Sequence, residues 1–261
     1  MNFADQYYKK NIIQRLLGQG ELLTVFCVGT NMPLVECSEK TCNDRVYVLE
    51  NESLLKEFVK PYFEKKMPVK GIKYTAKDKM QFFAAAVSIN VDEIVYVDSS
   101  GRHILQLSDV VRKKDLSEIP KEKRPIENPA LQLSAFYFIQ EASRGVPPSE
   151  KKGLKELEEE MTANLLKGTY LIPADIQEDE PKGQLPVKIP LIKAPNGDLY
   201  QPIFADTIEF AKYNKDQKFR ALAVPFAALD KLLAGEAKGF MLNPNGYHLI
   251  ITRELLAKLT Q

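Results

Sequence analysis

The chain has 261 residues, of which 44% are hydrophobic and 27% charged, which is ordinary for a globular protein with one large domain or two small ones. Its 36 Lys and Arg residues nearly balance its 35 Asp and Glu residues, so no net field would draw it to nucleic acid or to an anionic membrane. No apolar run approaches the roughly 20 residues that span a bilayer, and charges interrupt the N-terminal stretch where a signal peptide would be apolar. We therefore expect a soluble cytoplasmic protein.

The first half of the chain predicts alternating helices and strands. Apolar residues recur at helical spacing in some stretches and alternate with polar residues in others. The predicted elements are a helix over 5–20 with Tyr8, Ile12, Ile13, Leu16 and Leu17 on one side, a strand over 21–29, a hairpin of 33–37 and 45–50 with the tip 38–44, a helix over 52–63, a strand over 70–74, a helix over 75–87 capped by Thr75 and Asp78, and strands over 92–97 and 102–107 joined by the turn 98–101.

The second half predicts a similar series and carries clearer end signals. Ser149 is expected to cap the first helix and Gly168 to end it, and Asn196-Gly197 is typical of a tight hairpin turn. The predicted elements are a helix over 149–168, a strand over 169–176, a hairpin over 188–204, a helix over 206–214 capped by Asp206, a strand over 219–225, a helix over 226–236 with Phe226, Leu229, Leu232 and Leu233 facing inward, strands over 239–244 and 247–252 around the turn 243–246, and a helical segment over 253–260.

Both halves follow one order of elements, which indicates an internal duplication. The order is helix, strand, hairpin, helix, strand, helix, strand, turn and strand. The positions that align are Gly101 with Gly246, His103 with His248, Asp98 with Asn243, Ile104 with Leu249, and Tyr47-Val48-Leu49 with Pro202-Ile203-Phe204. We therefore predict an α+β fold of two tandem related domains, each a mixed β-sheet with flanking helices.

A connector separates the predicted copies. Residues 112–125 are charged and contain proline, whereas residues 128–145 predict an apolar helix that packs between the repeats. The predicted domains are a diverged repeat over 1–112, a charged linker with the connector helix over 113–148, and the second repeat over 149–261. Inside the second repeat, the acidic and proline-rich stretch 177–186 predicts an exposed loop.

His103 and His248 are the chain's two histidines, and each follows a turn glycine by two residues. A catalytic pair would need a nucleophile within hydrogen-bond reach, and neither histidine lies in a motif that supplies one. Duplication explains the repeated position without any chemistry. We therefore predict no catalytic residues, and we place both histidines at equivalent strand positions.

Cys37 and Cys42 flank the tip of the first hairpin with a spacing that also occurs in half of a zinc site. A structural zinc site needs four ligands, and the remaining candidates are Cys27 and two distant histidines. An odd number of cysteines does not form a disulfide framework. We expect ordinary thiols here, with no metal and no cofactor, although zinc or redox use stays an alternative.

A basic cluster in the connector is the one segment that resembles a phosphate-binding surface. It contains Arg112, Lys113, Lys114, Lys121, Lys123 and Arg124. Acidic residues interrupt the cluster and no aromatic stacking platform lies within it, so a solvated linker is expected, and nucleic-acid binding through the linker stays a third possibility. The chain also lacks the common phosphate-loop, dinucleotide-binding, serine-elbow and His-Glu-x-x-His motifs.

A family resemblance rests on an ordered series of segments in the second half: "TYLIPADI", "PLIKAPNGDLYQPIFAD", "EFAKY" and "RALAVPFAALDKLLAGEAKGFMLNPNGYHLIITRELL". Over residues 155–258 the chain resembles the N-terminal domain of the SseB family, the bacterial "enhanced serine sensitivity" proteins. Gly239 to Pro244 carries the family's Gly-(Leu/Phe)-x-(Leu/Ile)-Asn-Pro pattern and is the most specific part. The first half departs from this pattern, because Asp98-Ser99 replaces Asn-Pro and the hairpin lacks its Asn-Gly turn.

The resemblance implies no catalytic residues, so the role of Asn243 and Pro244 is predicted from their backbone and hydrogen-bonding properties. Pro244 fixes its own backbone dihedral and is expected to hold Asn243 extended, while the Asn243 side chain can bond backbone groups of the turn. The expected role is structural, and the turn is also the candidate contact for a partner. The candidate contact residues are Asn243, Pro244, Asn245, Tyr247 and His248.

Two functional hypotheses follow. The leading one is a non-enzymatic cytoplasmic protein of the SseB family that binds a protein partner or regulates it. The alternative is an amino-acid sensor or enzyme, related to serine, with a site between the two repeats. The sequence does not indicate the oligomeric state.

Overall fold

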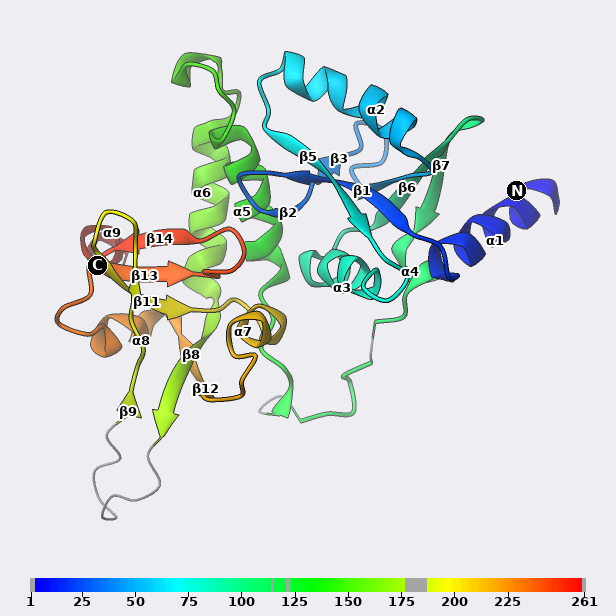
Figure 1. Cartoon of the computed structure of the whole chain (residues 1–261). Coiled ribbons are helices and arrows are strands. Elements are labelled where there is room, and N and C mark those ends of the chain that lie inside the picture. Colours follow the sequence, from blue (N-terminus) through cyan, green and yellow to red (C-terminus); the bar gives the residue numbers. More distant parts are fainter. Residues whose placement is uncertain (1–2, 114, 121–122, 177–186, 260–261) are drawn as a thin grey trace. The chain divides into compact units, whose positions relative to one another are not determined.

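The computed structural model describes residues 3–113, 115–120, 123–176 and 187–259, and it confirms the predicted α+β class (Figure 1). The chain divides into two compact units. Unit 1 comprises Met1–Glu118 and Ala135–Leu157, and unit 2 comprises Ile119–Ser134 and Glu158–Gln261. The division passes through helices α5 (Pro129–Ala142) and α6 (Leu154–Lys167), whose segments are shared between the units. The predicted exposed loop over 177–186 lies outside the described residues.

Unit 1 contains a seven-stranded mixed sheet with helices on its two faces. Its elements before α5 are α1 (Phe3–Leu17), β1 (Leu22–Cys27), β2 (Met32–Pro33), β3 (Glu36–Cys37), β4 (Asp44–Leu49), α2 (Glu52–Glu64), β5 (Val69–Tyr74), α3 (Met80–Ile89), β6 (Glu93–Asp98), β7 (Gly101–Gln106) and α4 (Leu107–Val110). The strand β1 pairs antiparallel with β2, β4 and β5. The strand β4 pairs antiparallel with β3 and parallel with β6, which pairs antiparallel with β7 at the sheet's edge.

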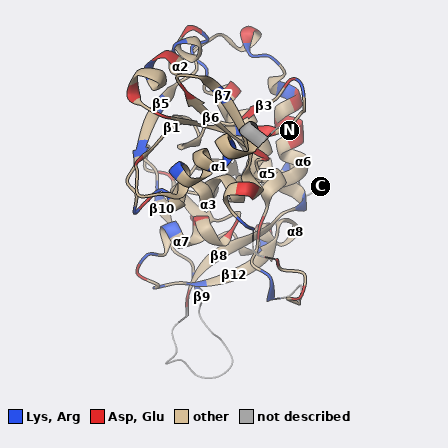
Figure 2. Cartoon of the chain, turned by 90° about the vertical axis from the view of Figure 1, so that its right-hand side faces the viewer, with Lys and Arg blue, Asp and Glu red and all other residues tan. Residues whose placement is uncertain are grey.

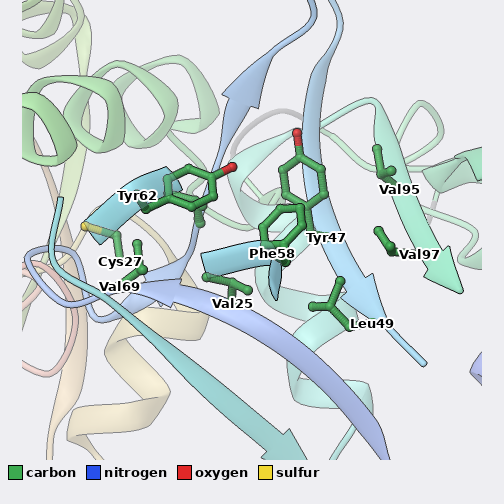
Figure 3. Close-up of a cluster of buried hydrophobic side chains, with 10 residues drawn as sticks. Val25, Cys27, Tyr47, Leu49, Phe58, Tyr62, Val69, Val95 and Val97 are labelled. Atoms are coloured by element: carbon green, nitrogen blue, oxygen red, sulfur yellow. The ribbon is translucent and has the colours of Figure 1, made fainter. Parts of the chain in front are cut away.

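The central strands of this sheet bury consecutive side chains, because both faces are covered. On the face that α2 covers, Tyr47, Phe58 and Tyr62 pack their rings together, with ring centroids 4.7 and 5.5 Å apart (Figure 3). Valines from neighbouring strands complete this cluster, and Val25 is fully buried. Helix α3 lies on the opposite face and buries Phe82 and Phe83 completely. Removal of this apolar surface from water is the main driving force for folding of the unit.

Unit 2 contains two small sheets that one bridge connects. Its elements after α6 are β8 (Thr169–Ile176), β9 (Val187–Lys188), β10 (Ile192–Lys193), β11 (Leu199–Ile203), α7 (Thr207–Tyr213), β12 (Arg220–Pro225), α8 (Phe226–Leu229), η3 (Asp230–Leu232), β13 (Gly239–Leu242), β14 (Leu249–Thr252) and α9 (Arg253–Leu259). One sheet has the order β12-β8-β9 and the other β10-β11-β13-β14. Leu171 and Phe204 exchange two backbone hydrogen bonds of 2.9 Å, which join β8 to the end of β11.

The two units share one order of strand pairings. In unit 2, β8 pairs antiparallel with β9 and β12, as β1 does with β2 and β5. The strand β11 pairs antiparallel with β10 and parallel with β13, as β4 does with β3 and β6. Both series end in an antiparallel pair, β13-β14 and β6-β7. This correspondence supports the predicted duplication, which remains our proposal.

The caps of α2 and α7 extend the correspondence to single side chains. Asn51 accepts the backbone N–H of Leu54, and Asp206 accepts that of Glu209, each in the extended conformation that a cap requires. Both caps lie two residues beyond the aligned hairpin positions Leu49 and Phe204. The predicted capping role of Asp206 is confirmed.

Several predicted boundaries are wrong. Helix α3 begins at Met80 rather than at Thr75, because the N–H groups of Asp78 and Lys79 bond to the Thr75 carbonyl in a preceding turn. The helix predicted over 226–236 ends after one α-helical turn and a 3-10 turn, and Leu232 is 40% exposed instead of inward-facing. On α1, Ile12 and Leu16 are buried as predicted, whereas Tyr8 and Leu17 are exposed.

Candidate functional site

The turn between β13 and β14 presents only part of its predicted contact surface to solvent. Asn245 and His248 are exposed and Pro244 is half-buried. Asn243 is fully buried and Tyr247 is 3% exposed, so these two side chains serve the fold rather than an outside contact. His248 precedes β14 instead of lying in it, and its backbone φ is 38°. The predicted equivalence with His103, which lies inside β7, is therefore wrong.

Asn243 organises this turn. Its backbone carbonyl accepts the N–H groups of Gly246 and His248 at 2.9 and 3.1 Å. Its side-chain Oδ1 accepts the N–H of Ala205 at 2.9 Å, which fixes the turn to the end of β11. Contrary to the prediction, the Asn243 side chain therefore bonds a backbone group at the end of β11 and not one of the turn, and the predicted extended conformation of Asn243 is also wrong. Its φ is 49°, in the left-handed region that asparagine tolerates better than most residues.

A buried polar cluster lies beneath the turn. It consists of Gln132, Asp206, Glu209 and Asn243, each at most 3% exposed. Gln132 Nε2 donates to Asp206 Oδ2, and the ammonium of Lys212 pairs with Glu209. The other carboxylate oxygen of Glu209 faces Gly246, where an added Cβ would lie only 2.8 Å from it. The turn therefore packs directly on a buried carboxylate.

Burial dominates the acid–base properties of this cluster. It raises the pKa of Asp206 to about 6, and the neighbouring charge of Glu209 acts in the same direction. Two bonded backbone N–H groups and Lys212 oppose the rise. Burial also raises the pKa of Tyr247, together with the neighbouring Tyr170 and the two carboxylates. Asp206 can therefore change protonation close to neutral pH.

Of this cluster, the sequence predicts only that Asp206 caps α7. Asp206 preceding the helix and Glu209 three residues later form a recognisable capping pattern. Nothing in that pattern shows that both carboxylates are buried. Their burial depends on Gln132 and Tyr247, which are distant in the sequence, so only the tertiary structure reveals the cluster.

The turn between β6 and β7 holds a second group of polar side chains. Asp98 Oδ1 accepts the backbone N–H and hydroxyl of Ser100 at 2.8 and 2.7 Å, and His103 Nε2 lies 3.1 Å away. The Tyr8 hydroxyl donates to Asp98 Oδ2 at 2.5 Å, and its ring packs on the imidazole. Burial raises the pKa of Asp98, but these hydrogen bonds outweigh it and hold the pKa below its ordinary value.

These residue types occur in catalytic triads, but the arrangement differs. In a triad the imidazole uses one nitrogen for the serine and the other for the carboxylate. Here the same Nε2 of His103 lies 3.0 Å from Ser100 Oγ and 3.1 Å from Asp98 Oδ1. Ser100 also bonds directly to Asp98, so its hydroxyl proton already has an acceptor. The group closes a hairpin and ties it to α1 instead of activating a nucleophile.

The cysteines do not form a cluster. All three are free thiols, with Cys37 and Cys42 exposed and Cys27 buried. Burial and the nearby charge of Asp44 raise the pKa of the Cys37 thiol, which favours its protonated, less reactive form. Within the described ranges no three His, Cys, Asp or Glu side chains come together in a way that could hold a metal ion.

Basic and acidic residues are interspersed along the ribbon rather than separated by sign (Figure 2). In the predicted basic cluster, the guanidinium of Arg124 donates to the backbone carbonyl of Ile119 at 2.8 Å, while Lys114 and Lys121 lie outside the described residues. None of the helices in the described part of the chain has the length and apolar character needed to cross a membrane.

Comparison with known proteins gives one match. Residues 152–258 match the family model described as the SseB protein N-terminal domain. This range includes β13, β14, the turn between them and the helix α7 beneath it. No curated protein and no solved structure matches the chain significantly.

Proposed function

We propose, from the match of residues 152–258 to the SseB N-terminal domain model, that the protein is a non-enzymatic cytoplasmic binding or regulatory protein. Its partner is a protein, and the contact is the exposed part of the turn between β13 and β14. The contact residues are Pro244, Asn245 and His248. Asn243 and Tyr247 take part only by holding the turn.

The observation that carries this proposal is that the exposed turn between β13 and β14 is held in place by hydrogen bonds and packs on the buried polar cluster. Asn243 bonds to Ala205 through its side chain and to two turn N–H groups through its carbonyl. The exposed Asn245 is also tied down, because its Nδ2 donates to the Lys212 carbonyl at 3.1 Å. A turn that is ordered before binding loses little conformational entropy on forming a complex. Such pre-organisation is common to contacts that a partner recognises by shape.

A pull-down with two matched double variants tests the proposal. Asn245→Ala with His248→Asn removes the exposed side chains, and asparagine retains tolerance for the left-handed backbone at position 248. The control changes Lys215 and Asp216, which are exposed in another loop of unit 2, to alanine. Each tagged protein captures its partner from a lysate of the source cells, and the captured proteins are identified by mass spectrometry.

We expect one partner to be retained by the unchanged protein and by the control variant and lost from the turn variant. Equal capture by all three proteins, or no specific capture at all, would contradict the proposal. Circular dichroism of the purified variants verifies that both remain folded.

A further inference from the structure

Unit 1 contains a cavity of about 710 Å³ that the sequence did not predict. Residues of β3, β4 and β7 line it, together with residues from the part of α5 that belongs to unit 1. A volume of this size is typical of a site for a small organic ligand. The cavity is distinct from the turn of unit 2.

The wall of this cavity is fixed by hydrogen bonds. The buried amide of Gln140 donates to the Val35 carbonyl at 2.9 Å and accepts the Val35 N–H at 3.0 Å. On the next helical turn, the Tyr137 hydroxyl donates to Asp44. These contacts hold α5 against the segment before β3, so the cavity is formed before any ligand enters.

Part of the lining is apolar and accessible. Ile104 on the edge strand β7 is 42% exposed, although it is a large aliphatic side chain. Met67, Tyr137 and Leu157 line the same cavity, and none of the three is fully buried. An apolar ligand body that covered these side chains would remove their surface from water.

The charged lining contains the cations Lys40, Arg45 and Arg102 and the carboxylates Glu36, Glu39 and Glu141. Glu36 accepts the Tyr47 hydroxyl at 2.5 Å, and Glu141 pairs with Arg144 at 2.6 Å. Arg45 pairs with Glu93 at 2.8 Å. In contrast, Lys40 and Arg102 form no ion pair with any described residue. Lys40 is exposed at the tip between β3 and β4, whereas the Arg102 guanidinium lies over the Phe58 ring, 5.5 Å from its centroid.

Arg102 and Ile104 are two residues apart on β7, so they share one face of this strand and both line the cavity. A ligand that covers Ile104 can therefore place a negatively charged acceptor on Arg102. Guanidinium groups bind carboxylates through two parallel N–H donors, and they also stack on the faces of aromatic rings. We propose that this cavity binds a small organic acid, with its carboxylate on Arg102 and its apolar body against Ile104 and Met67.

Three matched probes test the proposal by NMR of the full chain labelled at its Ile and Met methyl groups. The probes are 4-phenylbutyrate, its uncharged amide 4-phenylbutyramide and its cationic analogue 4-phenylbutylamine. We expect saturable shifts of the Ile104 and Met67 methyl signals, with the acid binding about tenfold more tightly than the amide. The amine binds no better than the amide, because Glu36 and Glu141 already have partners and the exposed Glu39 is next to Lys40 in the chain.

Variants separate the charge contact from the apolar one. Arg102→Gln lowers the affinity for the acid to that for the amide and leaves the amide unchanged, while Arg112→Gln, an exposed arginine elsewhere in unit 1, changes neither. Ile104→Ala weakens acid and amide alike. The proposal fails if amide or amine binds as tightly as the acid, if no probe gives saturable shifts, or if Arg102→Gln leaves acid binding unchanged.

Discussion

Asp206 shows how one side chain can serve structure and respond to pH. Its carboxylate caps α7 by accepting the Glu209 N–H at 2.7 Å, and its burial raises the pKa to about 6. Its other oxygen accepts the amide of Gln132, whose own oxygen has no hydrogen-bond partner. Rotation of that amide would present an acceptor to a protonated Asp206. The same position in unit 1 carries Asn51, which caps without a charge.

The first prediction concerns Asp206→Asn. A pKa raised from 3.8 to about 6 means that the folded state holds the proton more tightly than the unfolded state. The associated stability is complete below about pH 4 and is lost as pH rises through 6, a total of roughly 3 kcal/mol. Asparagine keeps the cap and carries no charge. We expect the variant to exceed the unchanged protein in unfolding free energy at pH 7.5.

Urea denaturation from pH 4.5 to 8 measures this difference. The advantage of the variant should shrink towards the acidic end, because Asp206 is then neutral in the unchanged protein as well. An advantage that does not vary with pH, or a variant that is less stable at pH 7.5, would show that the buried carboxyl does not titrate in this way.

The second prediction concerns Asn243→Ala. The change leaves the Ala205 N–H without its acceptor and places alanine at a φ of 49°. Loss of the acceptor costs about 1–3 kcal/mol and the left-handed backbone about 1 kcal/mol. We expect unit 2 to lose roughly 2–4 kcal/mol in urea denaturation. The neighbouring Asn245→Ala removes only an exposed hydrogen bond to the Lys212 carbonyl and should cost about 1 kcal/mol or less; similar losses in both variants would contradict this account of the turn.

Helices and strands of this protein could be predicted where residues close together in the sequence determine their ends. The cap at Asp206 has a local cause, and the hairpin of β3 and β4 follows from apolar strands around a polar tip. The start of α3 was missed because Thr75 forms a separate turn before the helix. His248 was wrongly predicted to lie in a strand, because a six-residue connection, 243–248, replaces the two-residue turn of unit 1.

The candidate sites were predictable only in part. The Asn-Pro segment located the turn, but burial of Asn243 and Tyr247 depends on contacts with β11 and α7. The cavity of unit 1 combines side chains from residues 35 to 157, and no local pattern marks it. Side chains that meet across such sequence separations are set by packing, which periodicity does not describe.

The third prediction belongs to the pairing of β13 with β14. Gly239 has a φ of 154°, and an added Cβ would lie 2.1 Å from the backbone carbonyl oxygen of Ile251 on the partner strand. Gly239→Ala must therefore separate the two strands at this point, and we expect a loss of at least 3 kcal/mol, in the range of the largest single-residue effects. Gly235→Ala is the control, because no atom lies within 4 Å of its added Cβ. Thermal unfolding of both variants checks the difference; equal midpoints would contradict the close approach.

At the scale of the whole molecule, the two units share one order of strand pairings but differ in the polar residues at the turn between their last two strands. The last strand pair of unit 1 closes with a short turn whose Asp98, Ser100 and His103 bond to one another. The corresponding pair of unit 2 closes with a longer turn that rests on buried carboxylates and exposes Asn245. This divergence is consistent with the proposed duplication and with the proposed use of the turn in unit 2, which lies within the range that matches the SseB family model, as a partner contact.

Site-specific photo-crosslinking in the source cells tests the central claim most directly. p-Benzoylphenylalanine replaces Asn245 in the turn or, as a control, the exposed Lys215 of the same unit. The account predicts that irradiation links one defined protein to the chain from position 245 and not from position 215. The absence of any crosslink from position 245, or the same products from both positions, would contradict the assignment of this turn as the partner contact.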